Sequence, residues 1–152
     1  MNDMRLRRRT VVLALALAGA VGVVTACKTM TDPPYTQEVE LTGANEVPAV
    51  KTSASGNATV TIKPDRSVSV KVKYRDMVGT ASHIHEGAAG TNGPVIVPFT
   101  KTADDTFESS PGATLTEAQY AAYRQGNLYV NVHTAKNPGG ELRGQIKAVA
   151  IP

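Results

Sequence analysis

Three histidines are the residues of this sequence best suited to chemistry. His83 and His85 are separated by the single residue Ile84. In a β-strand alternate side chains share a face, so the two imidazoles project to one side and Ile84 to the other. A strand through this segment would therefore present two histidines together.

The stretch around the third histidine alternates in the same way. Its apolar positions share one face: Leu128, Val130 and Val132. Its polar positions share the other: Tyr129, Asn131 and His133. If Ile84 and Val132 both face a core, all three imidazoles point away from it, and neighbouring strands would gather them into one cluster on the outer face.

Three neutral imidazoles converging at about 2 Å on one point commonly hold Cu or Zn. The competing interpretation is structural: histidines that bond turn carbonyls, or exposed polar members of alternating strands. The matching parity of the three positions favours metal. Ligand histidines must be neutral, so we expect weaker binding toward pH 5. The residues that could complete the coordination shell are Tyr129, Glu86 and Met77.

No catalytic set accompanies the histidines in the sequence. Ser82 adjoins His83, but neighbours in a strand face opposite ways, and no spaced acid completes a triad. Glu86 and Glu141 are candidate carboxylates, although single glutamates on strands are usually solvated surface. We therefore expect a protein that is not an enzyme, with weak copper redox activity as the remaining enzymatic alternative.

Strands are the elements that must position these residues. Period-two alternation predicts strands at Ser67 to Tyr74, around Ala58 to Ile62, and around Val39 and Leu41. Further strands are expected at residues 81–86, 94–99, 127–134 and 141–151, between turns rich in Gly and Pro. Seven short strands without βαβ alternation indicate an all-β antiparallel sandwich or barrel.

One short helix is predicted from Leu115 to Gln125. Thr114 with Glu117 reads as a capping box, and Gly126 as the C′ residue. One face of this helix is expected to pack on the edge of the sheet through Leu115, Ala118, Ala122 and Tyr123.

The N-terminus has the features of an export segment. Four arginines between positions 5 and 9 precede an apolar run from Val11 to Val24, too short at 14 residues to span a bilayer as a helix. The run ends in Val24-Thr25-Ala26-Cys27, which resembles the bacterial lipobox, whose cysteine is diacylated and becomes the new N-terminus. Ordinary cleavage that leaves Cys27 a free thiol is the alternative. Cys27 is the only cysteine, which favours lipidation.

The chain thus divides into a lipoprotein signal peptide (1–26), a lipidated tether (27–36) and one domain (37–152). Lys28 stands where an Asp would retain the protein at an inner membrane, so we expect an envelope lipoprotein on the outer membrane, facing the periplasm or the cell surface. Two acyl chains give a stable anchor. Arg8-Arg9 weakly resembles a twin-arginine signal, and general secretion is the alternative route.

Charge excludes nucleic acid as a partner. Four of the 16 Lys and Arg and one of the 13 Asp and Glu precede Cys27, which leaves 12 of each in the mature chain. No surplus positive charge remains to bind phosphates.

The motifs of the domain resemble the CHRD domain, named for its repeats in chordin. The matching segments are Leu41 to Pro48, His83 to Gly87, Gly90 to Val95, Leu128 to Thr134 and Asn137 to Ile146. This resemblance covers about residues 37 to 149 and implies a β-sandwich module of bacterial exported proteins.

The chain is also distantly similar to Cu,Zn superoxide dismutase, through its His-x-His, its later Val-x-Val-His and its final Gly-Gly-x-x-Arg-Gly strand. That likeness implies an immunoglobulin-like Greek-key barrel, with His83, His85 and His133 as copper ligands and Arg143 near the metal. A bridging histidine, a zinc loop and a disulfide are missing, so superoxide dismutation is not expected.

The expected function is copper binding through the three histidines, for sequestration or for delivery to a metal-handling partner. The alternative is a protein-interaction or envelope-structural module without metal.

Overall fold

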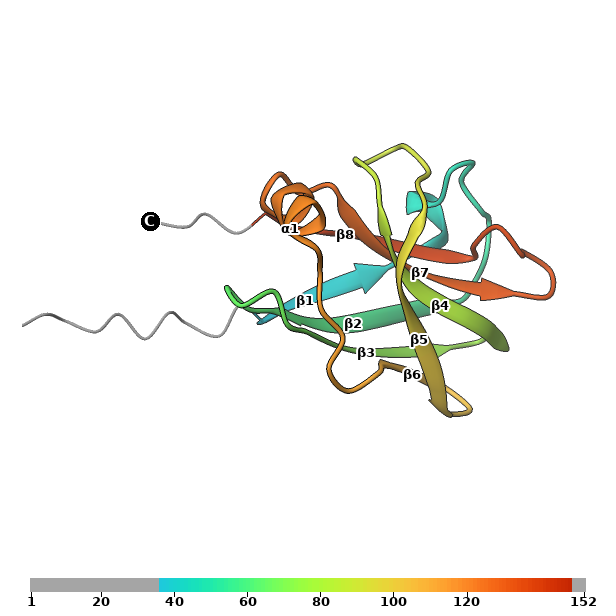
Figure 1. Cartoon of the computed structure of the whole chain (residues 1–152). Helices are drawn as coiled ribbons and strands as arrows, with labels where there is room; N and C mark the ends of the chain where they lie inside the picture. Colours follow the sequence, from blue (N-terminus) through green and yellow to red (C-terminus); the bar gives the residue numbers. More distant parts are fainter. Residues whose placement is uncertain (1–35, 149–152) are drawn as a thin grey trace, which may run out of the picture. The chain divides into compact units, whose positions relative to one another are not determined.

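The computed structural model describes residues 36–148, an antiparallel sheet of eight strands with one short α-helix (Figure 1). In chain order the elements are β1 (Thr36–Leu41), η1 (Gly43–Asn45), β2 (Ser55–Ile62), β3 (Val68–Arg75), β4 (Gly79–Glu86), β5 (Val95–Ala103), β6 (Thr106–Ser109), α1 (Glu117–Arg124), β7 (Leu128–Thr134) and β8 (Leu142–Ile146). The expected signal peptide, Cys27, the tether up to residue 35 and residues 149–152 lie outside the described residues. Within residues 36–148, no helix has the length and apolarity to cross a membrane.

The strands follow the order β1-β2-β3-β6-β5-β4-β7-β8, and all neighbours are antiparallel. The consecutive strands β4, β5 and β6 lie side by side, and β7 returns to lie beside β4, which is a Greek-key arrangement. The two ends of the sheet meet, because Thr42 and Arg143 exchange backbone hydrogen bonds of 3.1 and 3.0 Å. The sheet is therefore a nearly closed barrel, and the predicted all-β fold is confirmed.

Alternation along the strands builds the core. β3 is the clearest case, since Val68, Val70, Val72 and Tyr74 are buried and the residues between them exposed. Ile84 of β4 and Val132 of β7 are both 0% exposed and point into the same core. The outer face of the barrel is left to the alternate residues of β4 and β7.

The helix begins later than the sequence analysis expected. Thr116 caps it and Gln119 closes the capping box, so the prediction of Thr114 with Glu117 was wrong. The reason is tertiary: Thr114 bridges Ser67, and the amide of the buried Leu115 donates to the carbonyl of Arg66, which holds both residues extended.

The predicted end of the helix is confirmed, and its predicted buried face is confirmed in part. Gly126 ends the helix with φ +75°, and its amide donates to the Tyr123 carbonyl, as a C′ glycine should. Ala122 and Tyr123 are buried, but Ala118 is exposed and does not pack on the sheet.

Three strands also differ from expectation. The sequence did not predict β6, because a strand of only four residues is too short to show a clear alternation of apolar and polar residues. This strand pairs with both β3 and β5 and so links the two halves of the barrel. The final strand ends at Ile146. β5 continues past Phe99 to Ala103 through exposed polar residues.

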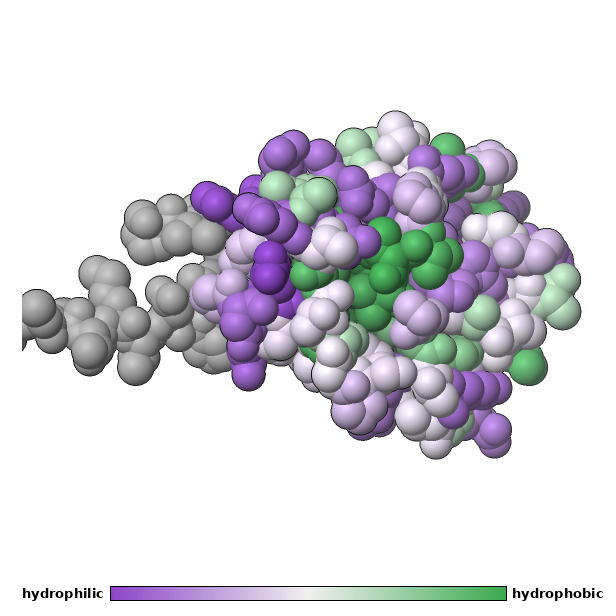
Figure 2. All heavy atoms as spheres, in the orientation of Figure 1, coloured by the Kyte–Doolittle hydropathy of each residue, from purple (hydrophilic) through white to green (hydrophobic). Residues whose placement is uncertain are grey.

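The surface seen from the side of β5 is largely polar, with an apolar patch near its middle (Figure 2). On this strand Val95 is 48% exposed, and Ile96 is partly buried against the core. Val95 pairs with His85 of β4, so apolar surface adjoins the histidine-bearing strand.

Closure of the barrel makes a testable demand on Gly144 of β8. A Cβ there would meet the backbone oxygen of Glu40 and side chains of β1. We expect Gly144→Ala to lower the free energy of unfolding by about 1–3 kcal/mol, because β1 and β8 must separate. Urea denaturation measures this. Gly139→Ala is the control, since nothing lies within 4 Å of its Cβ position; equal stability of both variants would contradict this account of closure.

Candidate metal centre

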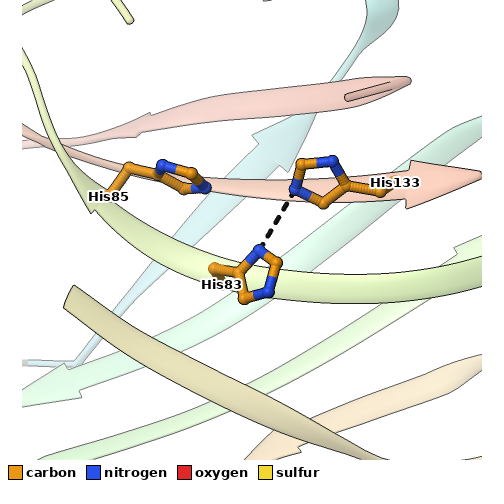
Figure 3. A group of neighbouring side chains, drawn as sticks. All are labelled: His83, His85 and His133. Atoms are coloured by element: carbon orange, nitrogen blue, oxygen red, sulfur yellow. Dashed lines mark hydrogen bonds between the residues drawn. The ribbon is translucent and has the colours of Figure 1, made fainter. Parts of the chain in front are cut away.

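The three histidines lie together on the outer side of β4 and β7 (Figure 3). β4 pairs with β7 so that His83 is opposite Asn131, and Ala81 is opposite His133. This register places His133 diagonally across from His83. The predicted parity is confirmed, because Ile84 and Val132 occupy the core on the other side.

The spacing of the ring nitrogens is close to that of a coordination site. One nitrogen from each histidine can be chosen so that all lie within 4.8 Å of one another. His83 Nδ1 and His133 Nε2 are 3.1 Å apart. Nitrogens bound to one metal at about 2.0–2.1 Å in tetrahedral geometry are roughly 3.3 Å apart. The His83–His133 pair already has this separation, and His85 needs only a small displacement.

Backbone carbonyls orient two of the rings. His85 Nδ1 lies 2.8 Å from the Gly93 oxygen, and His133 Nδ1 lies 2.8 Å from the Pro138 oxygen. A carbonyl only accepts, so each Nδ1 carries the hydrogen, and Nε2 of the neutral ring has a lone pair. For His133 that lone pair accepts a hydrogen bond from His83 Nδ1, and the Asn131 amide must turn its NH2 group toward it, because an amide oxygen cannot donate. Metal-binding histidines are commonly held in this way, with one nitrogen donating to a carbonyl and the other left for the ion.

His85 is the most sheltered of the three ligands. His85 is only 8% exposed. Among residues 36–148, its Nε2 has no hydrogen-bond partner. A buried polar atom left without a partner costs about 1–3 kcal/mol, which a bound ion would recover.

Burial favours the neutral form of His83 and His85. Burial first, and then the charges that His133 and His85 would carry, lower the pKa of His83 to about 4. Burial also lowers the pKa of His85, against the opposing effect of the Gly93 carbonyl. Neutral imidazole is the form that binds metal. His83 therefore stays neutral at pH 5, and the expected weakening of metal binding toward that pH cannot come from this ligand.

A second layer supports His85 from the side of β8. The Tyr129 ring stacks on His85 with centroids 4.8 Å apart and planes 7° apart. The guanidinium of Arg143 lies over the Tyr129 ring, with Cζ 3.5 Å from its centroid. Because β7 lies between β4 and β8, the three groups follow the order of the strands. Arg143 therefore reaches the centre through Tyr129.

Arg143 also fastens the loop between β4 and β5. It is 1% exposed and donates to the carbonyls of Ala88 (3.2 Å) and Thr91 (2.8 Å) and to Asn92 Oδ1 (3.2 Å). The amide of Gly93 donates to the Tyr129 hydroxyl at 3.2 Å. The loop thus covers Tyr129 and fixes the carbonyl that orients His85. The centre thus lies on the outer face of the two strands, as predicted, and the loop makes it half-buried.

Three further residues considered in the sequence take different places. Glu86 pairs with the buried Leu128, so alternation puts its side chain on the face opposite to the imidazoles, and no described carboxylate joins the cluster. Met77 packs against the core. Asn131 was not proposed as part of the site, yet its Oδ1 lies 3.0 Å from His133 Nε2. Its place between Tyr129 and His133 in the alternation was the available signal.

The fold and the site together define a Greek-key β-barrel module with a three-histidine candidate metal centre on two paired strands. The family model of the CHRD domain matches residues 37–146, most of the chain. The chain therefore belongs to the CHRD domain family, as its motifs had suggested. No curated protein matches it. No solved structure matches it either.

The shifted pKa of His83 predicts a pH effect on stability. Between pH 6.5 and about 4 the unfolded chain binds a proton at this position and the folded chain does not, so the His83 contribution weakens as pH falls through this window. We expect the stability of the wild type relative to His83→Gln to fall by about 1–2 kcal/mol from pH 7 to pH 4, allowing for solvent screening.

Urea denaturation at the two pH values, without metal, measures this difference. Titrating groups away from the cluster are common to both proteins and cancel. A relative stability that stays constant from pH 7 to pH 4 would show that His83 titrates as a solvated imidazole.

Proposed function

We propose that this chain is an exported, lipid-anchored protein whose CHRD domain binds a metal ion, copper, through His83, His85 and His133. The observation that carries the proposal is the buried lone pair of His85 Nε2, which has no hydrogen-bond partner among residues 36–148 and lies beside two other imidazoles. The CHRD domain is not an enzyme family. The activity proposed is therefore binding, for sequestration or delivery, rather than turnover.

Copper is favoured over other ions by the ligand type. Imidazole suits Zn, Cu, Fe and Ni, and among divalent first-row ions copper binds nitrogen sites most tightly. The second layer supports ligand binding, since Tyr129 and the Gly93 carbonyl fix the His85 ring. Preorganised rings lose little conformational freedom when the ion binds.

Metal titration of the full chain, purified in detergent, tests this function. We expect one equivalent of Cu(II) or Cu(I) to bind at micromolar concentration or below, and His133→Ala to weaken binding at least tenfold because one of three ligands is lost. Glu86→Gln is the matched control. It adjoins His85 but lies on the opposite face, so binding should be unchanged.

Two results would contradict the function. The first is that neither Cu(II) nor Cu(I) binds at micromolar concentration. The second is that His133→Ala leaves the affinity for copper unchanged. In that case the alternative of a metal-free interaction or envelope-structural module is preferred, and a variant lacking all three histidines should still capture its partner.

The proposed location has its own test at Cys27. Diacylation there would anchor the protein on the outer membrane, facing the periplasm or the cell surface. We expect Cys27→Ser to abolish labelling by a radioactive fatty acid and to move the protein out of the membrane fraction, or leave it as an unprocessed precursor. Labelling that persists in the variant would overturn the assignment.

A further inference from the structure

The ligands of the histidine cluster bring no negative charge to a bound ion. Three neutral imidazoles supply its ligands, and within residues 36–148 no carboxylate lies among them. Such a ligand set leaves the full charge of the ion uncompensated. The free-energy cost of taking an ion out of water grows with the square of its charge, so a divalent ion is penalised far more than a monovalent one.

The nearest buried charge to His85 is positive. Arg143 lies over Tyr129, and Tyr129 stacks on His85. Arg143 is almost wholly buried, so water screens its charge poorly. At an effective dielectric constant of about 20, a guanidinium roughly 10 Å from the ion lowers the affinity of the site for a divalent ion about tenfold more than its affinity for a monovalent ion.

Neighbouring carboxyl groups do not offset this charge at the metal. Glu141 accepts hydrogen bonds from Thr52 (2.7 Å) and Thr134 (2.6 Å). Thr134 is buried and follows His133 in β7, so alternation places Glu141 on the opposite face of the strand. Glu46 lies near Arg143, but burial raises its pKa to about 7, which keeps much of it protonated at neutral pH.

We propose that the site selects monovalent copper, Cu(I), over divalent ions, and that the buried charge of Arg143 sets this preference. The inference rests on the proposed metal-binding function and adds to it the oxidation state of the ion. Three nitrogen ligands suffice for Cu(I), whereas Zn(II) needs a fourth ligand, usually a water.

Competition between Ag(I), a redox-inert stand-in for Cu(I), and Zn(II) on the full chain in detergent tests the inference. We expect Ag(I) to bind at least 100-fold more tightly. Arg143→Met should reduce the ratio of the two affinities about tenfold, because the charge is removed with little change in volume. Arg124→Met, on the exposed side of α1, makes the same chemical change away from the site and should leave the ratio unaltered.

Arg143 also holds the loop, so a second variant keeps the test decisive if Arg143→Met does not fold. Asn131→Asp changes one atom type and places a negative charge about 3 Å from His133 Nε2. It should favour Zn(II) over Ag(I) at least tenfold relative to wild type. Asn127→Asp, at the partly exposed start of β7, is its control.

The outcomes separate the two claims. If Zn(II) binds the wild type as tightly as Ag(I), the selectivity is wrong although metal binding stands. If Ag(I) binds more tightly but Arg143→Met and Asn131→Asp leave the ratio unchanged, charge near the centre does not set the preference and the role proposed for Arg143 is wrong. If the wild type binds neither ion, the proposed function fails, and the selectivity fails with it.

Discussion

The pairing of β4 with β7 is the constraint on which the candidate centre depends. Ile84 and Val132 are fully buried, and this fixes which face of each strand points outward. The register then sets how far along the barrel the outward residues lie, with His83 opposite Asn131 and His133 two residue pairs away, opposite Ala81. A slip of β4 by one residue would turn His83 and His85 into the core and away from His133. The hydrophobic core therefore holds the cluster together without contacting the imidazoles itself.

Closure of the barrel supplies the second layer. β8 joins β7 on one side and meets the end of β1 on the other, so Arg143 is buried at the seam. From there its guanidinium covers Tyr129 and holds three acceptors of the loop after β4. The same residue thus stabilises the loop, supports the ring behind His85 and brings a positive charge near the centre. The proposed metal preference is therefore coupled to the stability of the loop through this one side chain.

The parts of this structure that depend on local alternation could be predicted from sequence. The strands through Val70, Ile84 and Val130 follow period two, and the common face of the three histidines follows from that period alone. The start of the helix could not be predicted from the local sequence, because Leu115 is buried in the core and its amide donates to the carbonyl of Arg66, which is distant in sequence. The burial of the centre could not be predicted from the local sequence either, because Arg143 donates to loop residues that lie more than 50 positions away in the sequence.

The proposed function requires that the three imidazoles bind a single ion. Anomalous X-ray diffraction at the copper absorption edge, from crystals of the copper-loaded full chain, tests it most directly. The account predicts one strong peak about 2.0 Å from a ring nitrogen of each of His83, His85 and His133. A peak elsewhere on the protein, or no peak between rings that keep the 3.1 Å contact of His83 with His133, would contradict it.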